Sequence, residues 1–416
     1  MRVHKFGGAS VANAAAIRNV AWIIGHFRDE AGVIVVSAMG KTTNALEEVV
    51  RSFYAKDGRC ATLLAKLKED HLTQCQELIP DESHPVYAEI DNVFVELEWA
   101  TEGEPRGEYD FEYDQIVSYG EFLSTHIVSA FLKTQGFDQQ WLDIRDYLRT
   151  NNNYRNANVL WDESQELVDQ SWPKEKWVVT QGYVGCTTEN FNTTLGREGS
   201  DYTAAILAYL LDAEEVVIWK DVPGLMNADP AEVKDAIKLD KVSFTEAIEL
   251  AFYGAKVIHP KTLQPLKRKN IPLRVQPFGD TEAGGTVIRA GEGQVPQVPS
   301  IIIKHDQVML SLKTRDLAFV AEEHMGFIFN LLYKCGFRVN LMQNSAVSFT
   351  VTGECDDKHL AALVQALDEK LDVKFNTGLE MMTIRHYTEA DYHRALENKK
   401  IILEQRTRQT LQILWK

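Results

Sequence analysis

The alternation of short β-branched runs with longer amphipathic stretches, from the first residues to about residue 290, most constrains the fold of this chain. The runs "VIVVSA" (33–38), "WVVTQGYVG" (177–185) and "EVVIWKDV" (215–222) are expected to be buried strands. Helical periodicity marks "TTNALEEVVRSFYA" (42–55) and "SDYTAAILAYLL" (200–211). Strand, helix and strand at this spacing predict βαβ units, and therefore an α/β fold with a mainly parallel central sheet sandwiched by helices.

The rest of the chain suggests an insertion and a second region. Residues 63–134 are mostly helical in period, so we expect a helical lid that could receive the smaller substrate. Glycine, proline and polar residues crowd together in "AGEGQVPQVPS" (290–300), which indicates a linker. We therefore expect one domain at residues 1–293 and a regulatory region at residues 294–416, in which a βαββα unit is followed by a weaker copy.

Composition argues against several classes of protein. The formal net charge is −16 and no basic stripe stands out, which argues against nucleic-acid binding. No signal peptide precedes Lys5, and no apolar run approaches the roughly 20 residues that a membrane span needs. The cysteines show no C-x-x-C pair and no zinc spacing, so we expect reduced thiols in a soluble, cytoplasmic protein. They are Cys60, Cys75, Cys186, Cys335 and Cys355.

The motif "KFGG" places Lys5 and two glycines where the first strand should pass into a helix. In open α/β sheets, ligands lie beyond the carboxyl ends of the strands and close to helix N-termini. Backbone amides around Gly7, Gly8 and Ser10 would face such a ligand, and Lys5 would add a positive charge. This arrangement suits the phosphates of a nucleotide, although a lysine–glycine turn is more often purely structural. Neither a P-loop nor a dinucleotide fingerprint is present.

The stretch "TTLGREGSDYTAA" (193–205) is more informative. Its Arg197 stands between two glycines, and the planar guanidinium fits a carboxylate in bidentate fashion. Ser200 and Asp201 stand at the expected start of a helix, where such residues commonly serve as caps. Asp201 could also orient a magnesium-bound phosphate or hold a lysine in place.

Two later motifs are ambiguous when taken alone. "KDVPGLMNADP" (220–230) follows a predicted strand and could form an adenine or ribose pocket, or an ordinary proline–glycine turn. "FYGAKVIHP" (252–260) contains Lys256, which by itself would more often be a solvated surface lysine.

Together, "KFGG", "SAMGKTTN", "SYGE", "LGREGSD", "DVPG…ADP" and "GAKVIHP" closely resemble, in order and spacing, the aspartate kinases of the amino acid kinase family. The resemblance implies the amino acid kinase fold, followed by ferredoxin-like (ACT) βαββ-type regulatory units. It also implies transfer of the γ-phosphoryl group of ATP, bound with Mg²⁺, to the side-chain carboxylate of L-aspartate. Fixed cations and Mg²⁺ would stabilise the transferring oxygens without a covalent enzyme intermediate. No tightly bound cofactor and no protein-held metal are expected.

The resemblance assigns roles to residues of this chain, and each is an expectation. The catalytic residues would be Lys5, Asp201 and Lys256. The nucleotide would be bound by Lys5, Gly7, Gly8, Ser10, Lys220, Asp221, Met226, Lys256 and Val257. The aspartate would be bound by Ser37, Thr43, Glu121, Arg197 and Ser200, with Arg197 on its carboxylate and Glu121 on its ammonium.

Several positions depart from the family pattern. Ala9 lacks the hydroxyl of the usual "KFGGTS", and Glu198 replaces a glycine, which puts a negative charge beside the phosphates unless it points outward. Lys220, Met226 and Ala231 replace the threonine, tyrosine and arginine found in many relatives. Lys220 could add a phosphate or ribose contact, and Met226 could pack on the base.

The tail resembles paired ACT domains that bind amino acids between subunits. A unit at about residues 308–375 would be inserted in a second one formed by residues 296–307 and 376–416. We expect a homodimer or larger assembly, with feedback by lysine or threonine as the family expectation and pure dimerisation as the alternative. The candidate effector residues lie in an expected loop and on the strand facing it: His324, Met325, Gly326, Phe327, Asn340, Gln343 and Asn344.

Two other functions remain open at this stage. The chain could be a non-catalytic amino-acid sensor that kept the fold, as Ala9, Glu198 and Ala231 would suggest. It could also be a kinase of another small acceptor, such as glutamate, acetylglutamate or UMP, although the tail and the "SYGE" helix argue against this.

Overall fold

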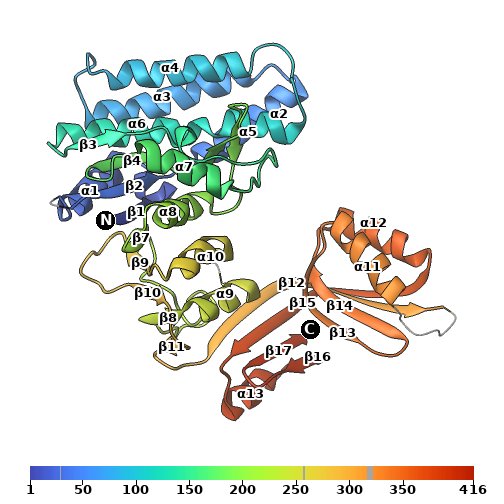
Figure 1. Ribbon diagram of the computed structural model, residues 1–416. Helices are drawn as coiled ribbons and strands as arrows, with labels where there is room; N and C mark the ends of the chain where they lie inside the picture. Colours follow the sequence, from blue (N-terminus) through green and yellow to red (C-terminus); the bar gives the residue numbers. More distant parts are fainter. Residues whose placement is uncertain (29, 256–257, 316–321) are drawn as a thin grey trace. The chain divides into compact units, whose positions relative to one another are not determined.

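The computed structural model describes residues 1–28, 30–255, 258–315 and 322–416 (Figure 1). The chain forms two compact units, each built from more than one segment. The first unit comprises Met1–Leu225, Lys238–Ile248 and Lys256–Pro296. The second comprises Met226–Ile237, Glu249–Ala255 and Gln297–Lys416. The predicted domain boundary at residue 293 remains a prediction.

The first unit is organised around a nine-stranded sheet with the strand order β11-β8-β10-β9-β7-β1-β2-β4-β3. The pairs from β9 through β7, β1, β2 and β4 to β3 are parallel, so the predicted mainly parallel sheet is confirmed. Its strands are β1 (Arg2–Phe6), β2 (Gly32–Val36), β3 (Gln139–Trp141), β4 (Trp177–Gln181), β7 (Glu215–Lys220), β8 (Lys241–Ser243), β9 (Leu273–Pro277), β10 (Thr286–Arg289) and β11 (Gln294–Val295). A small hairpin, β5 (Val184–Cys186) and β6 (Asn192–Thr194), lies outside this sheet.

Helices cover the sheet because its central strands are apolar on both faces. Every residue of β2 and β4 is buried, which is typical of a strand with helices on each side. α8 packs on β1 and β7, α6 packs on β2 and β4, and α3 and α4 pack on α6. The helices before residue 300 are α1 (Ala14–Gly25), α2 (Thr42–Ala55), α3 (Cys60–Leu78), α4 (Val86–Ala100), α5 (Tyr109–Val117), α6 (Tyr119–Thr134), α7 (Trp161–Ser171), α8 (Gly199–Leu210), α9 (Phe244–Tyr253) and α10 (Pro260–Lys269), with short 3-10 turns at η1 (Gly8–Val11) and η2 (Ile144–Asp146).

The predicted elements of this unit are largely confirmed. The helical period of residues 63–134 corresponds to α3, α4, α5 and α6. The single strand expected at residues 177–185 is wrong, because the chain leaves the sheet at Gly182 and pairs again in the β5–β6 hairpin. No helix in the described part of the chain is long and apolar enough to cross a membrane.

The second unit contains a six-stranded antiparallel sheet with the order β13-β14-β12-β15-β17-β16. The long strands β12 and β15 pair with each other through a register shift between Lys304 and Met309. Its elements are β12 (Ser300–Thr314), α11 (Glu322–Lys334), β13 (Arg338–Asn344), β14 (Ser348–Glu354), α12 (Asp357–Asp368), β15 (Leu371–Arg385), α13 (Glu389–Leu396), β16 (Ile401–Arg406) and β17 (Thr410–Trp415).

Separate hydrophobic cores form along the two halves of these long strands. Leu310 of β12, Ile328 of α11 and Leu363 of α12 are fully buried in one core. Ile384 of β15 and Ile413 of β17 belong to another. This arrangement is consistent with ACT-like units, and the nesting predicted for them remains a prediction.

Gly182 provides a stability test of the contact between the sheet and α8. A Cβ atom at this position would lie 2.4 Å from Cβ of Ser200, at the start of α8. We expect Gly182→Ala to lower the free energy of unfolding by about 1–3 kcal/mol, because the overpacked contact must open. Urea denaturation measures this change. Gly25→Ala is the matched control, since nothing lies within 4 Å of its added methyl group, and an equal loss in both variants would contradict the prediction.

Candidate active site

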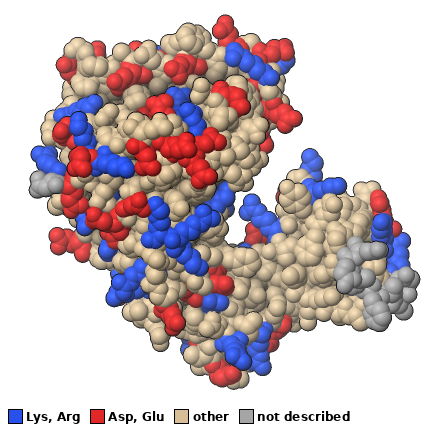
Figure 2. Space-filling view, in the orientation of Figure 1, with Lys and Arg blue, Asp and Glu red and all other residues tan. Residues whose placement is uncertain are grey.

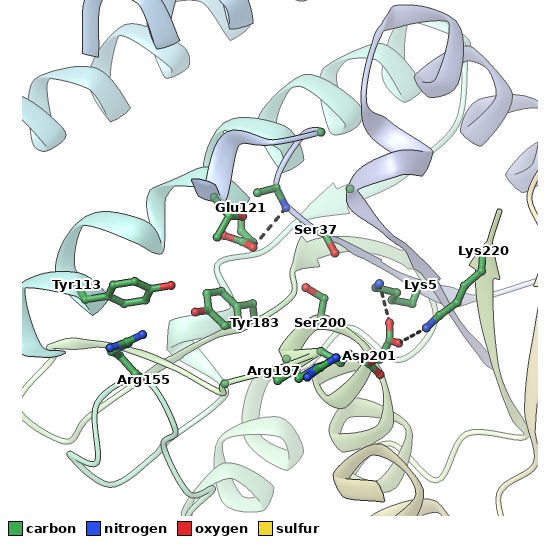
Figure 3. A pocket seen from close by; sticks show the side chains of 17 residues that line it. Lys5, Ser37, Tyr113, Glu121, Arg155, Tyr183, Arg197, Ser200, Asp201 and Lys220 are labelled. Atoms are coloured by element: carbon green, nitrogen blue, oxygen red, sulfur yellow. Dashed lines mark hydrogen bonds and ion pairs between the residues drawn. The ribbon is translucent and has the colours of Figure 1, made fainter. Parts of the chain in front are cut away.

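A pocket of about 490 Å³ lies at the carboxyl edge of the parallel sheet (Figure 3). The carboxyl ends of β1, β2 and β7 meet there because these strands run in the same direction. The loops after β1 and β2 and the first turn of α8 complete the wall. The lining residues are Lys5, Gly8, Ser37, Ala38, Gly40, Thr43, Tyr113, Glu121, Arg155, Tyr183, Gly196, Arg197, Glu198, Gly199, Ser200, Asp201 and Lys220.

A buried carboxylate between two ammonium groups forms one end of this pocket. Nζ of Lys5 lies 2.6 Å from Oδ1 of Asp201, and Nζ of Lys220 lies 3.1 Å from Oδ2 (Figure 3). The Asp201 side chain is only 3% exposed, and the Lys5 side chain is 9% exposed. Burial by itself would raise the pKa of Asp201, but the two ammonium groups hold it below its ordinary value. Lys5, Lys220 and Asp201 taken by themselves carry a formal charge of +1.

The two glycines of "KFGG" make room for neighbouring groups. A Cβ on Gly7 would lie 3.3 Å from Nζ of Lys5, and a Cβ on Gly8 would lie 3.0 Å from the carbonyl oxygen of Ala38. The amide of Ser10, which was expected to face the ligand, instead donates to the carbonyl of Gly7 inside the η1 turn. Of the predicted phosphate loop, Gly8 and Lys5 therefore line the pocket.

Glu121 lies in the first turn of α6 and is fully buried against the pocket. Its Oε1 accepts a hydrogen bond of 3.3 Å from the amide of Ala38. Its Oε2 is buried and has no hydrogen-bond partner within the described residues. Burial raises the pKa of Glu121 to about 8, although the Ala38 amide and the charge of Lys5 oppose this shift. A cation beside Glu121 would favour its ionised form and satisfy the free oxygen.

Arg197 stands at the rim of the pocket, exposed to solvent. The turn that presents it has positive φ on both sides, at Gly196 (80°) and Glu198 (54°). Ser37, Thr43 and Ser200, the other residues predicted to bind aspartate, line the same pocket. The structure therefore brings together all five residues of the predicted acceptor set.

Sequence reasoning missed the opposite end of the pocket, formed by Tyr113, Arg155 and Tyr183 (Figure 3). The Arg155 guanidinium lies 4.4 Å from the centre of the Tyr113 ring and 3.0 Å from the carboxylate of Asp110. The Tyr113 hydroxyl donates to Glu47 at 2.7 Å. Arg155 has a φ of 63°, unusual for a residue with a side chain. Its segment carries no motif, so only the fold could have revealed it.

Several predicted nucleotide-binding residues lie elsewhere. Within the described residues, Gly7, Ser10 and Asp221 lie outside the pocket lining. Gly7 and Asp221 follow β1 and β7 directly, and Ser10 lies in the η1 turn. Met226 belongs to the second unit, and its contact with the base remains a prediction. Lys256 and Val257 lie outside the described residues. The predicted roles of these residues are therefore not tested.

The first four predicted effector residues lie in a helix. His324, Met325, Gly326 and Phe327 form part of α11 rather than a loop, so that expectation is wrong. His324 lies in the first turn of α11, where backbone amide groups have no partner within the helix.

The remaining effector candidates lie on β13. The amide nitrogen of Asn340 donates to Gln307 at 2.7 Å and to Glu354 at 3.1 Å, and its oxygen accepts from Lys304 at 2.7 Å. Gln343 and Asn344 are exposed near the end of the strand. Asn340 is thus held in a polar network, whereas the other two side chains face solvent.

The net charge of the chain argues against binding of a polyanion such as nucleic acid. On the face shown in Figure 2, acidic and basic side chains are interspersed over the first unit, and the whole chain carries a formal net charge of −16.

Across the described residues, no group of three or more His, Cys, Asp or Glu side chains could hold a metal ion.

The amino-terminal part of the chain matches the model of the amino acid kinase family over residues 1–276. The lysine-sensitive aspartokinase 3 of Escherichia coli is 33% identical over 361 residues, which cover 84% of this chain and 77% of that protein. The chain belongs to the aspartokinases of the amino acid kinase family. A bifunctional aspartokinase/homoserine dehydrogenase 2 of Arabidopsis thaliana is another relative, 30% identical over 90% of this chain. The chain spans 42% of the length of that relative.

A solved aspartokinase structure resembles the whole chain. The crystal structure of E. coli aspartokinase III in complex with aspartate and ADP superposes with a TM-score of 0.83 at 28% identity, covering 100% of this chain and 96% of that chain. The aspartokinase fold predicted from the motifs is therefore confirmed.

The raised pKa of Glu121 predicts a pH-dependent stability. The carboxyl group stays protonated in the folded aspartokinase up to about pH 8, whereas in the unfolded chain it ionises near pH 4.5. The unfolded state therefore binds fewer protons between these values, and Glu121 lowers the free energy of unfolding as the pH rises, by at most about 1.4 kcal/mol per pH unit.

Denaturation of the wild type and of Glu121→Gln at pH 5.5 and 7.5 tests this prediction. We expect the variant to gain stability relative to the wild type at the higher pH, because glutamine cannot ionise. Parallel changes in the two proteins would contradict the assignment.

Proposed function

We propose that this protein is an aspartate kinase, which transfers the γ-phosphoryl group of ATP to the side-chain carboxylate of L-aspartate. The products would be 4-phospho-L-aspartate and ADP, on the route to lysine, threonine and methionine. The observation that carries the proposal is one pocket with a cationic end, where Lys5 and Lys220 contact Asp201, and with two further groups of opposite charge in its wall, the Glu121 carboxyl group and the Arg197 guanidinium. The E. coli structure in complex with aspartate and ADP supports the same assignment.

The cationic end suits the phosphate chain of MgATP. Negative charge spreads over the transferring oxygens during phosphoryl transfer, and fixed cations stabilise it without reorganisation. Lys5 would face this charge, and Asp201 would keep Lys5 in position, since their charged atoms are 2.6 Å apart in a buried setting. Mg²⁺ would arrive with the nucleotide, and Lys256 would act on the same phosphates.

The other groups suit an amino acid with an ammonium and a carboxylate. Glu121 offers a buried oxygen without a protein donor, which an ammonium group would satisfy. Arg197 would clamp a carboxylate in bidentate fashion, and the hydroxyl groups of Ser37, Thr43 and Ser200 would complete the site. Binding of the ammonium would also lower the pKa of Glu121, since an adjacent positive charge favours the ionised form.

Regulation and assembly are part of the proposal. The second unit would bind an amino-acid effector, and lysine is the first candidate because E. coli aspartokinase III has been solved in complex with lysine and aspartate. Threonine is the alternative effector. We propose a homodimer or larger assembly in the cytoplasm, although several plant relatives are chloroplastic.

An acceptor screen tests the proposed reaction. ADP release from MgATP should require L-aspartate, and hydroxylamine should trap the acyl phosphate as a hydroxamate. Glutamate, acetylglutamate and UMP serve as competing acceptors, and lysine and threonine serve as effectors. Aspartate-independent ADP release, or a better rate with another acceptor, would reject the assignment, and absence of any turnover would favour the sensor alternative.

Arg197→Ala should separate binding of the two substrates. Removing one member of a matched charge set costs several kcal/mol, so we expect the KM for aspartate to rise by about two orders of magnitude. The KM for ATP should stay nearly unchanged. Steady-state kinetics measure both constants.

The matched controls use the same type of change. Arg197→Lys keeps the charge but loses the planar fork, so it should fall between the wild type and Arg197→Ala. Arg408→Ala, in the exposed turn between β16 and β17, should leave the aspartate KM unchanged. A normal aspartate KM in Arg197→Ala would remove Arg197 from the acceptor site.

A further inference from the structure

The phosphate end of the pocket contains two lysines and two carboxylates. Lys5 and Lys220 both contact the carboxylate of Asp201, at 2.6 and 3.1 Å. Glu198 lines the same pocket, three residues before Asp201 in the chain. With both carboxylates ionised, these four side chains have a formal charge sum of zero.

Glu198 occupies an unfavourable position for a glutamate. Its φ of 54° lies in the left-handed region, where a side chain is strained. Burial raises the pKa of its carboxyl group, and the neighbouring charge of Asp201 raises it further, whereas the ammonium of Lys220 lowers it. Burial and Asp201 therefore disfavour the ionised form of Glu198, and the ammonium of Lys220 favours it.

A hydrogen bond to the backbone holds the Glu198 side chain in place. Its Oε2 accepts a hydrogen bond of 2.8 Å from the backbone amide of His259, the N-cap residue of α10. Its carboxylate is therefore fixed between the start of α8 and the start of α10. A fixed charge in a partly buried pocket acts on a bound phosphate chain more strongly than a mobile surface charge.

We propose that Lys220 and Glu198 are a compensating pair of opposite charges that sets the net charge at the phosphate end, and so sets the affinity for the nucleotide. This inference rests on the proposed function and extends it, because it names two residues that tune the binding of the phosphate chain. Lys220 adds the second ammonium on Asp201, and Glu198 cancels the excess positive charge that this ammonium brings.

Charge arithmetic gives the expected order of affinity. Without Lys220, the remaining Lys5, Asp201 and Glu198 sum to −1 and repel the phosphates. Without Glu198, the remaining three sum to +1 and attract them. Without both, the sum returns to zero, as in the wild type.

Calorimetric titration with MgADP tests the inference on four proteins: the wild type, Lys220→Met, Glu198→Gln and the double variant. We expect Lys220→Met to bind MgADP about tenfold or more weakly and Glu198→Gln to bind it more tightly, since one charge a few ångströms away has this effect at an intermediate dielectric constant. The compensation appears in the double variant, which should bind MgADP within a few-fold of the wild type, because its four positions again sum to zero.

Two controls separate charge from packing. Lys220→Arg keeps the positive charge and should bind MgADP within a few-fold of the wild type. Lys176→Met removes an exposed lysine just before β4, at the opposite edge of the sheet, and should not change the affinity. Circular dichroism and thermal unfolding confirm that each variant is folded.

The outcomes distinguish this inference from the proposed function, because binding of MgADP requires no acceptor. An unchanged affinity in Lys220→Met, a double variant that binds MgADP as weakly as Lys220→Met, or no binding of MgADP by the wild type would overturn the inference. The expected order of affinities without aspartate-dependent ADP release would support the charge pair and reject the kinase assignment. Aspartate-dependent turnover, together with a double variant that binds MgADP as weakly as Lys220→Met, would support the kinase and reject the pair.

Discussion

The shared carboxylate of Asp201 is the interaction on which the rest of the site depends. Two ammonium groups that approach one point would repel each other, and the buried carboxylate between them makes their proximity stable. β1 and β7 are hydrogen-bonded neighbours, with Phe6 opposite Trp219, so Lys5 and Lys220 leave the same edge of the sheet. The α8 helix then has to begin at that edge. A parallel sheet with crossover helices is the architecture that provides all three conditions.

Close backbone contacts keep these elements in position. Gly182 lets the end of β4 approach the first turn of α8, and Gly8 lets the loop after β1 approach the loop after β2. In both places a methyl group would collide with a neighbouring atom. The pocket therefore depends on the packing of loops that are distant in the sequence. The charged side chains line the cavity that this packing creates. The same packing buries the Glu121 carboxyl group away from solvent, and this burial raises its pKa.

Much of the site could be predicted because its residues belong to short local motifs. Lys5, Glu121, Arg197, Ser200 and Asp201 were each identified from the sequence, and the structure places all of them in one pocket. The second lysine on Asp201 was attributed to phosphate or ribose contact, because a sequence does not show which strands are neighbours. His324, Met325, Gly326 and Phe327 were expected in a loop because of the family resemblance, whereas the structure places them in α11.

The sequence by itself determined the order of strands and helices, the parallel direction of the central sheet and the local motifs that carry charge. These features depend on hydrophobic periodicity and on residues that are close together in the chain. Only the tertiary structure decided which charges meet. The Asp201 carboxylate is nearly 200 residues from Lys5 and binds it through space, and Arg155 reaches the pocket from a segment without any motif. Distances between remote side chains follow from strand register and helix packing, and these arise when the whole unit folds.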